Sequence, residues 1–193
     1  MMKLGVTGGI GSGKSYVCRI LQDEFDIPVY NCDINARIIT YTNLDVISQL
    51  SDLIPNLYNE EGELDKTLLA GYLFASEENA NRVNAIIHPA VRHDFRRWVE
   101  MRSDRPVLAV ESAILYESHF DTEVDRVLFV DAPLDVRIQR VRQRDGLSED
   151  EIRRRIALQQ TEQARTLADY ILLNDEASDV RSQLSEIVKS ISH

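Results

Sequence analysis

Residues 8–15 read GGIGSGKS and follow the short apolar run at 4–6. They fit the pattern G-x-x-x-x-G-K-[ST], in which backbone amides surround the phosphates of a nucleotide and the lysine reaches the β- and γ-phosphates. Glycine is favoured there because the backbone must turn its N–H groups toward an anion at close range. A helical pattern begins at Lys14, so the positive end of its dipole points at the same anion. The stretch therefore predicts a loop that binds a nucleoside triphosphate.

The side chains of this loop divide between phosphate binding and metal binding. Lys14 carries a positive charge to the phosphates, and the hydroxyl of Ser15 suits a Mg²⁺ ion that accompanies them. The expected nucleotide-binding residues of the loop are Gly8, Gly9, Gly11, Ser12, Gly13, Lys14, Ser15 and Tyr16. We therefore expect a nucleoside triphosphate and Mg²⁺ as cofactors.

Composition is typical of a single globular domain, which we expect to span residues 1–193. Hydrophobic residues make up 44% of the chain, which is enough for a substantial core. A net charge of −10 argues against a general nucleic-acid binder, and no apolar run approaches the ~20 residues of a membrane span. Cys18 and Cys32 match no zinc pattern and indicate buried or free thiols in a reducing compartment. We therefore expect a cytoplasmic protein with no nucleic-acid or membrane partner.

Apolar runs alternate with helical patterns along the chain, which predicts an α/β fold. Strands are expected at 3–7, 27–30, 106–110, 127–130 and 170–173. The run at 106–110 is continuously apolar, as in a strand buried on both faces of a parallel sheet. Because the carboxyl ends of parallel strands lie at one edge, the residues that follow them should meet near the phosphate loop. Asp33, Glu111 and Asn174 each follow such a strand.

Residues from about 35 to 103 carry mostly helical periodicity. This is more chain than the dozen or so residues of a simple crossover between parallel strands. We predict an inserted helical subdomain that holds a second substrate. Pro89 should kink or restart the last helix, because proline removes a backbone donor and crowds the preceding turn. The neighbouring His88 suits either a structural role or a substrate contact.

Seven arginines lie between residues 137 and 155 of this otherwise acidic chain. Arg137, Arg140 and Arg144 share one face of a predicted helix. The residues at 145–147 break that helix, and a capping box at 148–151 opens the next one. Two arginine-bearing helices joined by a glycine turn suit a lid at about 137–165 that closes over phosphates. A charged face turned toward solvent is the alternative.

Four side chains have candidate roles in phosphoryl transfer, two of them with open alternatives. Glu111 ends a central strand, where a carboxylate commonly holds Mg²⁺ or its water, although a helix cap or surface acid would also fit. Asp33 could accept the proton of an attacking hydroxyl, or it could be an outer ligand of the metal. Arg140 would contact the transferring phosphoryl group, since a guanidinium binds phosphate in a bidentate manner. Lys14 would neutralise charge on the same group.

A phosphate loop alone does not separate kinases from GTPases or motor ATPases. A GTPase would need D-x-x-G and N-K-x-D, yet no aspartate here has glycine three residues later and no asparagine precedes a lysine. About five parallel strands, a helical insertion and an arginine-rich lid are typical of small-molecule kinases. We therefore predict a three-layer P-loop kinase fold, similar to that of nucleoside monophosphate kinases. The alternative to an enzyme is a regulatory module that uses ATP binding as a switch.

Motifs across almost the whole chain resemble those of the dephospho-CoA kinase family. They are TGGIGSGKS at 7–15, Asp33 and Arg37 in CDINAR, IIHPAVR at 86–92, ESAILYES at 111–118, VDRVLFVDAP at 124–133, Gln139-Arg140 with Arg144, R-I-x-x-Q at 155–159, and Asn174. The phosphate loop is generic, whereas the other elements in this order are fairly specific. The resemblance implies ATP- and Mg²⁺-dependent phosphorylation of the 3′-hydroxyl of dephospho-CoA, the last step of coenzyme A synthesis.

The same resemblance implies roles for individual residues. Asp33 would be the catalytic base, Arg140 a lid contact to phosphate, and Arg144 and Asn174 further nucleotide contacts. The helical insertion would hold dephospho-CoA, which is the expected small-molecule partner. We expect the protein to be a monomer or a weak homo-oligomer. Another small-molecule kinase, such as a nucleoside monophosphate kinase, is the alternative enzyme.

The chain departs from the family pattern at four places. Tyr16 stands where threonine is usual, and Asn31 stands where many members have aspartate two residues before the expected base. Glu111 and Ala113 occupy the positions of a common D-x-P. Asn174 is followed by Asp175-Glu176 rather than by a glycine turn. The last departure predicts a shifted contact to the adenine.

Overall fold

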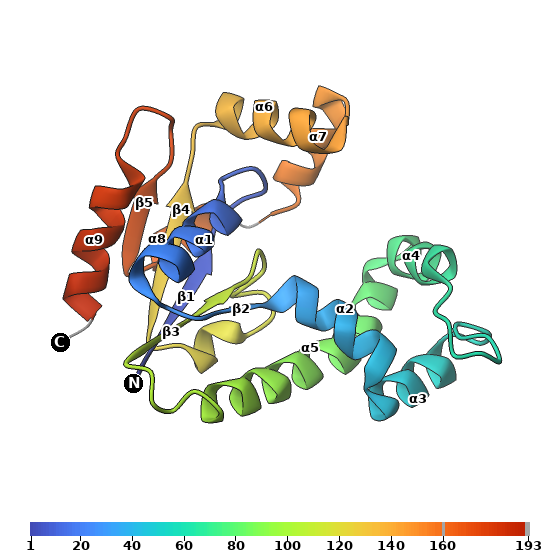
Figure 1. Cartoon of the computed structure of the whole chain (residues 1–193). Helices are drawn as coiled ribbons and strands as arrows, with labels where there is room; N and C mark the ends of the chain where they lie inside the picture. Colours follow the sequence, from blue (N-terminus) through green and yellow to red (C-terminus); the bar gives the residue numbers. More distant parts are fainter. Residues whose placement is uncertain (160, 192–193) are drawn as a thin grey trace. The chain divides into compact units, whose positions relative to one another are not determined.

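The computed structural model describes residues 1–159 and 161–191. By its internal contacts the chain divides into two compact units, which are considered separately (Figure 1). The first comprises Met1–Tyr30 and Arg102–His193 and contains most of the sheet; the second is Asn31–Met101 and is helical. We call them the sheet unit and the helical unit. Within the described residues, no helix has both the length and the apolar character needed to cross a membrane.

Five strands form a parallel sheet in the spatial order β2-β3-β1-β4-β5 (Figure 1). Their bounds are β1 Met2–Thr7, β2 Val29–Asn31, β3 Val107–Glu111, β4 Arg126–Asp131 and β5 Tyr170–Leu173. Every residue of β3 is buried, in agreement with its continuous apolar run. Helices cover both sides of the sheet, so the predicted α/β fold with five parallel strands is confirmed.

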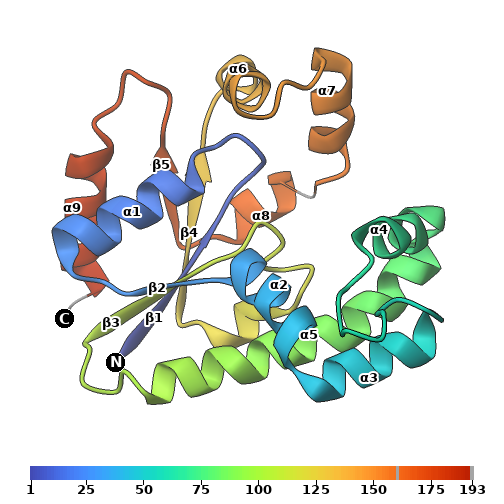
Figure 2. The same ribbon diagram turned by 45° about the vertical axis from the view of Figure 1, so that its right-hand side comes forward.

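Apolar faces of the neighbouring helices complete the core of the sheet unit. Helix α1 (Lys14–Phe25) buries Val17 and Leu21, and α9 (Val180–Ile191) buries Leu184, all in one cluster with strand residues. Helices α1 and α9 lie side by side (Figure 2). Helix α8 (Thr161–Leu167) contacts β4, and the 3₁₀ helix η1 (Phe120–Glu123) contacts β1. This packing fixes the carboxyl edge of the sheet, where the phosphate loop begins.

The arginine-rich segment of the sheet unit forms two helices with the predicted connection. Helix α6 (Leu134–Asp145) follows Pro133, which is its N-cap residue. It ends at Gly146, whose φ of 68° is in the left-handed region that favours glycine. Helix α7 (Glu149–Ala157) opens with the capping box between Ser148 and Glu151, which confirms that prediction.

The helical unit consists of α2 (Cys32–Thr42), α3 (Leu44–Leu53), α4 (Lys66–Ala75) and α5 (Glu77–Glu100). Polar side chains of Asn31, Asn43, Asp65 and Ser76 accept hydrogen bonds from backbone N–H groups at the four helix starts. Helices α2, α3 and α4 all pack on α5. Asn31 thus serves as the N-cap of α2.

Helix α5 continues through Pro89, so of the two expected outcomes, a kink or a restart, the restart was wrong. A proline inside a helix removes one donor and disturbs the turn before it. The helix is nevertheless 24 residues long. It packs against α2, α3 and α4, and this packing favours a continuous helix.

Candidate active site

The phosphate loop between β1 and α1 packs so tightly that glycine is required in it. Gly13 has a φ of 94°, and a Cβ at this position would collide with the side-chain nitrogen of Asn174. Gly8 has a φ of 148°, and its Cβ would collide with the carbonyl oxygen of Val130. Both positions therefore combine a left-handed backbone with close approach by another strand end. The loop is held against β4 and the residue after β5.

Lys14 is held by the backbone of this loop. Its Nζ donates hydrogen bonds to the carbonyl oxygens of Gly8 at 2.8 Å and Gly9 at 3.2 Å. Lysine is a flexible point charge with three donors. The ammonium can therefore exchange a carbonyl oxygen for a phosphate oxygen by rotation of its side chain alone.

The two predicted metal ligands are in direct contact. Ser15 Oγ donates a hydrogen bond of 2.6 Å to Glu111 Oε1. Glu111 ends β3 and is 8% exposed, and its backbone is paired with Val6, two residues before Gly8. A hydroxyl and a carboxylate supply the hard oxygen donors that Mg²⁺ prefers. The described residues contain no group of three or more His, Cys, Asp or Glu side chains placed to hold a metal. Mg²⁺ usually takes one or two carboxylates and completes its shell with phosphates and water.

Cys18 lies close to this pair but offers no reactive thiolate. Both cysteines are free and buried, as predicted. Burial raises the pKa of the Cys18 thiol well above its usual range, and the negative charge of Glu111 raises it further. The thiol is thus a packing group of α1.

Arg140 and Asn174, also predicted site residues, meet on the other side of the loop. Arg140 Nη1 donates to the carbonyl oxygen of Asn174 at 3.1 Å and to that of Ser12 at 3.4 Å. Asn174 Nδ2 donates to the Ser12 carbonyl oxygen at 2.8 Å. Arg140 Nη2 also reaches Glu176 Oε1 at 3.5 Å. Glu176 has a φ of 74°, so it takes the left-handed conformation that a glycine turn would otherwise supply.

Two pockets lie beside these contacts within the sheet unit, and they share Gly13, Tyr16 and Arg140. The smaller has a volume of about 160 Å³ and is also lined by Lys14, Ser15 and Arg144. The larger has a volume of about 470 Å³ and extends past Asn174 to Arg181 of α9. Most of the predicted nucleotide-binding residues therefore line one or both of these pockets, whereas Gly8, Gly9 and Ser12 line neither.

Arg144 lines the smaller pocket but is already paired. Its Nε donates to Asp145 Oδ1 at 2.7 Å and its Nη2 to Asp145 Oδ2 at 2.8 Å. These hydrogen bonds lower the pKa of Asp145 and raise the pKa of Arg144. Any contact between Arg144 and a phosphate would have to compete with this bidentate pair.

Two residues that we did not assign to the site form hydrogen bonds with the phosphate loop at Ile10. Arg137 Nε donates to the Ile10 carbonyl oxygen at 2.9 Å, and the Ile10 N–H donates to Gln159 Oε1 at 2.7 Å. Burial lowers the pKa of the Arg137 guanidinium, while the charges of Asp131 and Glu162 oppose that shift. The signals in the sequence were the arginine run and the R-I-x-x-Q motif, whose last residue is Gln159.

Replacement of Gln159 by alanine should raise the dissociation constant for ATP about tenfold. The Ile10 N–H would lose its acceptor in a partly buried loop, and an unsatisfied donor costs about 1–3 kcal/mol. Titration calorimetry with a non-hydrolysable ATP analogue would measure the change. Gln163→Ala, at an exposed position of α8, is the matched control. Equal affinities of the two variants would contradict a role for Gln159 in ordering the loop.

Asp33 lies in the helical unit, in the first turn of α2, and it is exposed. The contacts described above lie within the sheet unit and do not include it. Its position directly after β2 agrees with the expectation from the sequence. Its part in the chemistry stays a prediction.

Comparison with known proteins identifies the family. A sequence model of the dephospho-CoA kinase family matches residues 2–179. The dephospho-CoA kinase of Bacteroides fragilis (strain YCH46) is 39% identical over 188 residues, which are 97% of this chain and 91% of that protein. The dephospho-CoA kinase of Porphyromonas gingivalis is 40% identical over 194 residues, or 99% and 95% of the two chains. The crystal structure of TT1252 from Thermus thermophilus superposes with a TM-score of 0.85 at 29% identity and covers 98% of this chain and 96% of that one. The chain belongs to the dephospho-CoA kinase family.

Proposed function

We propose that the protein transfers the γ-phosphoryl group of ATP to the 3′-hydroxyl of dephospho-CoA, giving coenzyme A and ADP. The observation that carries the proposal is the contact between Ser15 and Glu111 beside Lys14, in a chain that matches the family from residue 2 to 179. Phosphoryl transfer needs positioning and charge neutralisation more than covalent chemistry by the protein. The phosphate loop is built for both tasks. We place the reaction in the cytoplasm and expect a monomer or weak homo-oligomer.

The sheet unit holds ATP in this proposal. The amides of residues 8–13 and Lys14 bind the β- and γ-phosphates, and the nucleoside occupies the larger pocket near Asn174. Ser15 and Glu111 hold Mg²⁺, which supplies charge neutralisation at the phosphate oxygens. Arg140 leaves Glu176, a partly exposed partner, and turns to the transferring phosphoryl group. Because that ion pair is long and its glutamate is exposed, giving it up costs little.

The helical unit holds dephospho-CoA, and Asp33 accepts the proton of its 3′-hydroxyl. Asp33 is exposed at the start of α2, so a substrate hydroxyl can reach its carboxylate. Removal of the proton makes the oxygen a better nucleophile toward the phosphoryl group. The role of an outer metal ligand is the alternative, and the Discussion separates the two.

Residues 137–165 act as a lid in this proposal. Arg137 and Gln159, near the two ends of this segment, both bind the Ile10 peptide of the loop. The segment therefore responds to changes in the loop through direct hydrogen bonds. Closure over ATP would exclude water, which would otherwise compete with the acceptor hydroxyl for the phosphoryl group.

The decisive experiment measures ADP release from purified protein with dephospho-CoA and, in parallel, with AMP, CMP and UMP as competing acceptors. We expect release to depend on dephospho-CoA, and mass spectrometry should identify coenzyme A. Preferred turnover of a nucleoside monophosphate would assign a different kinase activity. ATP binding without turnover of any acceptor would instead support a nucleotide-dependent switch.

A further inference from the structure

The guanidinium of Arg137, near the start of α6, lies directly against the backbone of the phosphate loop. A Cβ added to Gly9 would lie 2.1 Å from Nη2 and 2.5 Å from Cζ of this arginine. Gly9 differs from Gly8 and Gly13 in that its φ is not positive. Glycine is therefore required at residue 9 by the close approach of the arginine and not by the backbone conformation.

One nitrogen of this guanidinium lacks a hydrogen-bond partner. Nε donates to the Ile10 carbonyl oxygen, whereas Nη2 is buried and has no acceptor among the residues that the structure describes. Buried donors without an acceptor are rare in native proteins, because the donor has lost its water without a replacement. Arg137 lines neither of the two pockets beside the loop, so a phosphate bound in them is not the missing acceptor.

Carboxylates on two neighbouring elements favour the charged form of Arg137. Burial lowers the pKa of its guanidinium, whereas the charges of Asp131, at the end of β4, and Glu162, on α8, raise it. Asp131 is itself fixed, because its Oδ2 accepts a hydrogen bond of 3.0 Å from Arg165 Nε. Nη2 is therefore a charged donor, and hydrogen bonds from charged donors are about twice as strong as neutral ones.

The carbonyl oxygen of Gly9 is an acceptor that would lose a donor when phosphates bind. It accepts hydrogen bonds from the Ser12 N–H at 3.1 Å and from Lys14 Nζ at 3.2 Å. The lysine of such a loop reaches the β- and γ-phosphates of the nucleotide, so Lys14 would leave this carbonyl. The donor without an acceptor and the acceptor that loses its donor thus meet at the same glycine.

We propose that Arg137 is a positioning residue of the phosphate loop, which donates from Nη2 to the Gly9 carbonyl oxygen when the phosphates of ATP take Lys14. The inference rests on the proposed function, because that function makes ATP the ligand of the loop. The exchange leaves the Gly9 peptide hydrogen-bonded, so the loop keeps its shape while Lys14 turns to the nucleotide. Arg137 itself acts through the backbone and does not contact ATP.

Two substitutions of Arg137 separate this role from that of an anchor for Ile10. Arg137→Gln places an amide nitrogen near the position of Nε, so it can keep the donor to Ile10 but removes Nη2. Arg137→Lys places its ammonium near the position of Cζ, so it can serve Gly9. In calorimetry with a non-hydrolysable ATP analogue, Arg137→Gln should bind about tenfold more weakly than wild type, and Arg137→Lys should bind nearly as wild type. The reverse order of affinities would overturn the proposal in favour of the anchor.

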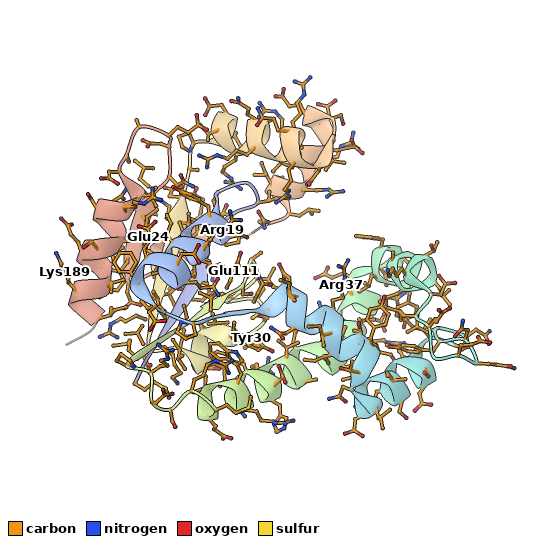
Figure 3. All side chains as sticks on the ribbon, viewed as in Figure 1. Arg19, Glu24, Tyr30, Arg37, Glu111 and Lys189 are labelled. Carbon is orange, nitrogen blue, oxygen red and sulfur yellow. The ribbon has the colours of Figure 1, made fainter. Side chains whose placement is uncertain are left out.

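Arg19→Gln is the matched control for the loss of charge. Arg19 projects from α1 (Figure 3), is exposed and lines neither pocket beside the loop. Its substitution should leave the affinity for the analogue as in wild type. Thermal melts without ligand should show Arg137→Gln as stable as wild type, because Nη2 forms no hydrogen bond in the ligand-free protein.

A crystal structure of the wild-type protein with the analogue and Mg²⁺ tests the contact without any variant. Nη2 should lie within about 3.2 Å of the Gly9 carbonyl oxygen, and Lys14 should contact the phosphates. Nη2 still without an acceptor, or Lys14 still on Gly9, would overturn the proposal. Failure of the proposed function is distinguishable, because the wild type would then bind the analogue but release no ADP with dephospho-CoA.

Discussion

Replacement of Asp33 by asparagine should lower kcat by about 10²–10⁴-fold and leave the affinity for ATP unchanged. The amide keeps the size of the side chain but cannot accept the proton of the acceptor hydroxyl. Asp33 is exposed in the first turn of α2, where asparagine fits without a change in packing. Steady-state turnover with saturating dephospho-CoA gives kcat, and calorimetry gives ATP affinity.

Asp45→Asn is the matched control for this experiment. Asp45 is also exposed in the first turn of a helix of the same unit, α3, and should give wild-type turnover. The metal-ligand alternative makes a different prediction for Asp33→Asn. Excess Mg²⁺ would then restore most of the lost turnover, whereas a missing base cannot be replaced by metal. If Asp33→Asn turns over near the wild-type rate, Asp33 is neither the catalytic base nor a metal ligand.

Replacement of Glu111 by glutamine should raise the Mg²⁺ concentration needed for half-maximal turnover by about 10–100-fold. Glu111 orients Ser15 through the 2.6 Å hydrogen bond, and loss of such a partner of a metal ligand typically costs this factor. Glutamine keeps the hydrogen-bonding oxygen and the volume but removes the charge. A Mg²⁺ titration of turnover measures the effect, and a thermal melt without ligand should show that the buried side chain is tolerated.

Glu117→Gln provides the comparison for the charge effect. Glu117 is exposed beyond β3, and its substitution changes the net charge equally without touching Ser15. It should leave the Mg²⁺ dependence as in wild type. A Glu111→Gln variant with the same Mg²⁺ dependence would show that Glu111 is a buried acid of the strand end and not part of the metal site.

Much of the fold followed from local patterns. The apolar run at 106–110, the glycine after α6 and the capping box of α7 all correspond to features of the structure. Each depends on residues within a few positions of one another, so the residue types suffice to predict it. The restart expected at Pro89 was wrong for the opposite reason. The path of α5 there depends on packing against three other helices.

The sequence predicted which residues belong to the candidate site, but it did not predict which of them are in contact. Lys14, Ser15 and Glu111 were found from the loop pattern and from a carboxylate at a strand end. That Ser15 Oγ meets Glu111 Oε1, 96 residues away, depends on the pairing of β1 with β3. The hydrogen bond from the Ile10 N–H to Gln159 joins residues that are 149 positions apart. We did not predict this contact, although we had noticed the motif that contains Gln159.

The sequence by itself determined the phosphate-binding loop, the alternation that builds a parallel sheet, and the family. These depend on backbone conformations and apolar periodicities that residue types encode locally. Only the tertiary structure decided which side chains meet across the loop, that Arg144 is engaged by Asp145, and that the guanidinium of Arg137 packs against Gly9. Strand register and helix packing set those contacts, and both arise from many weak interactions between distant segments that no short stretch of sequence contains.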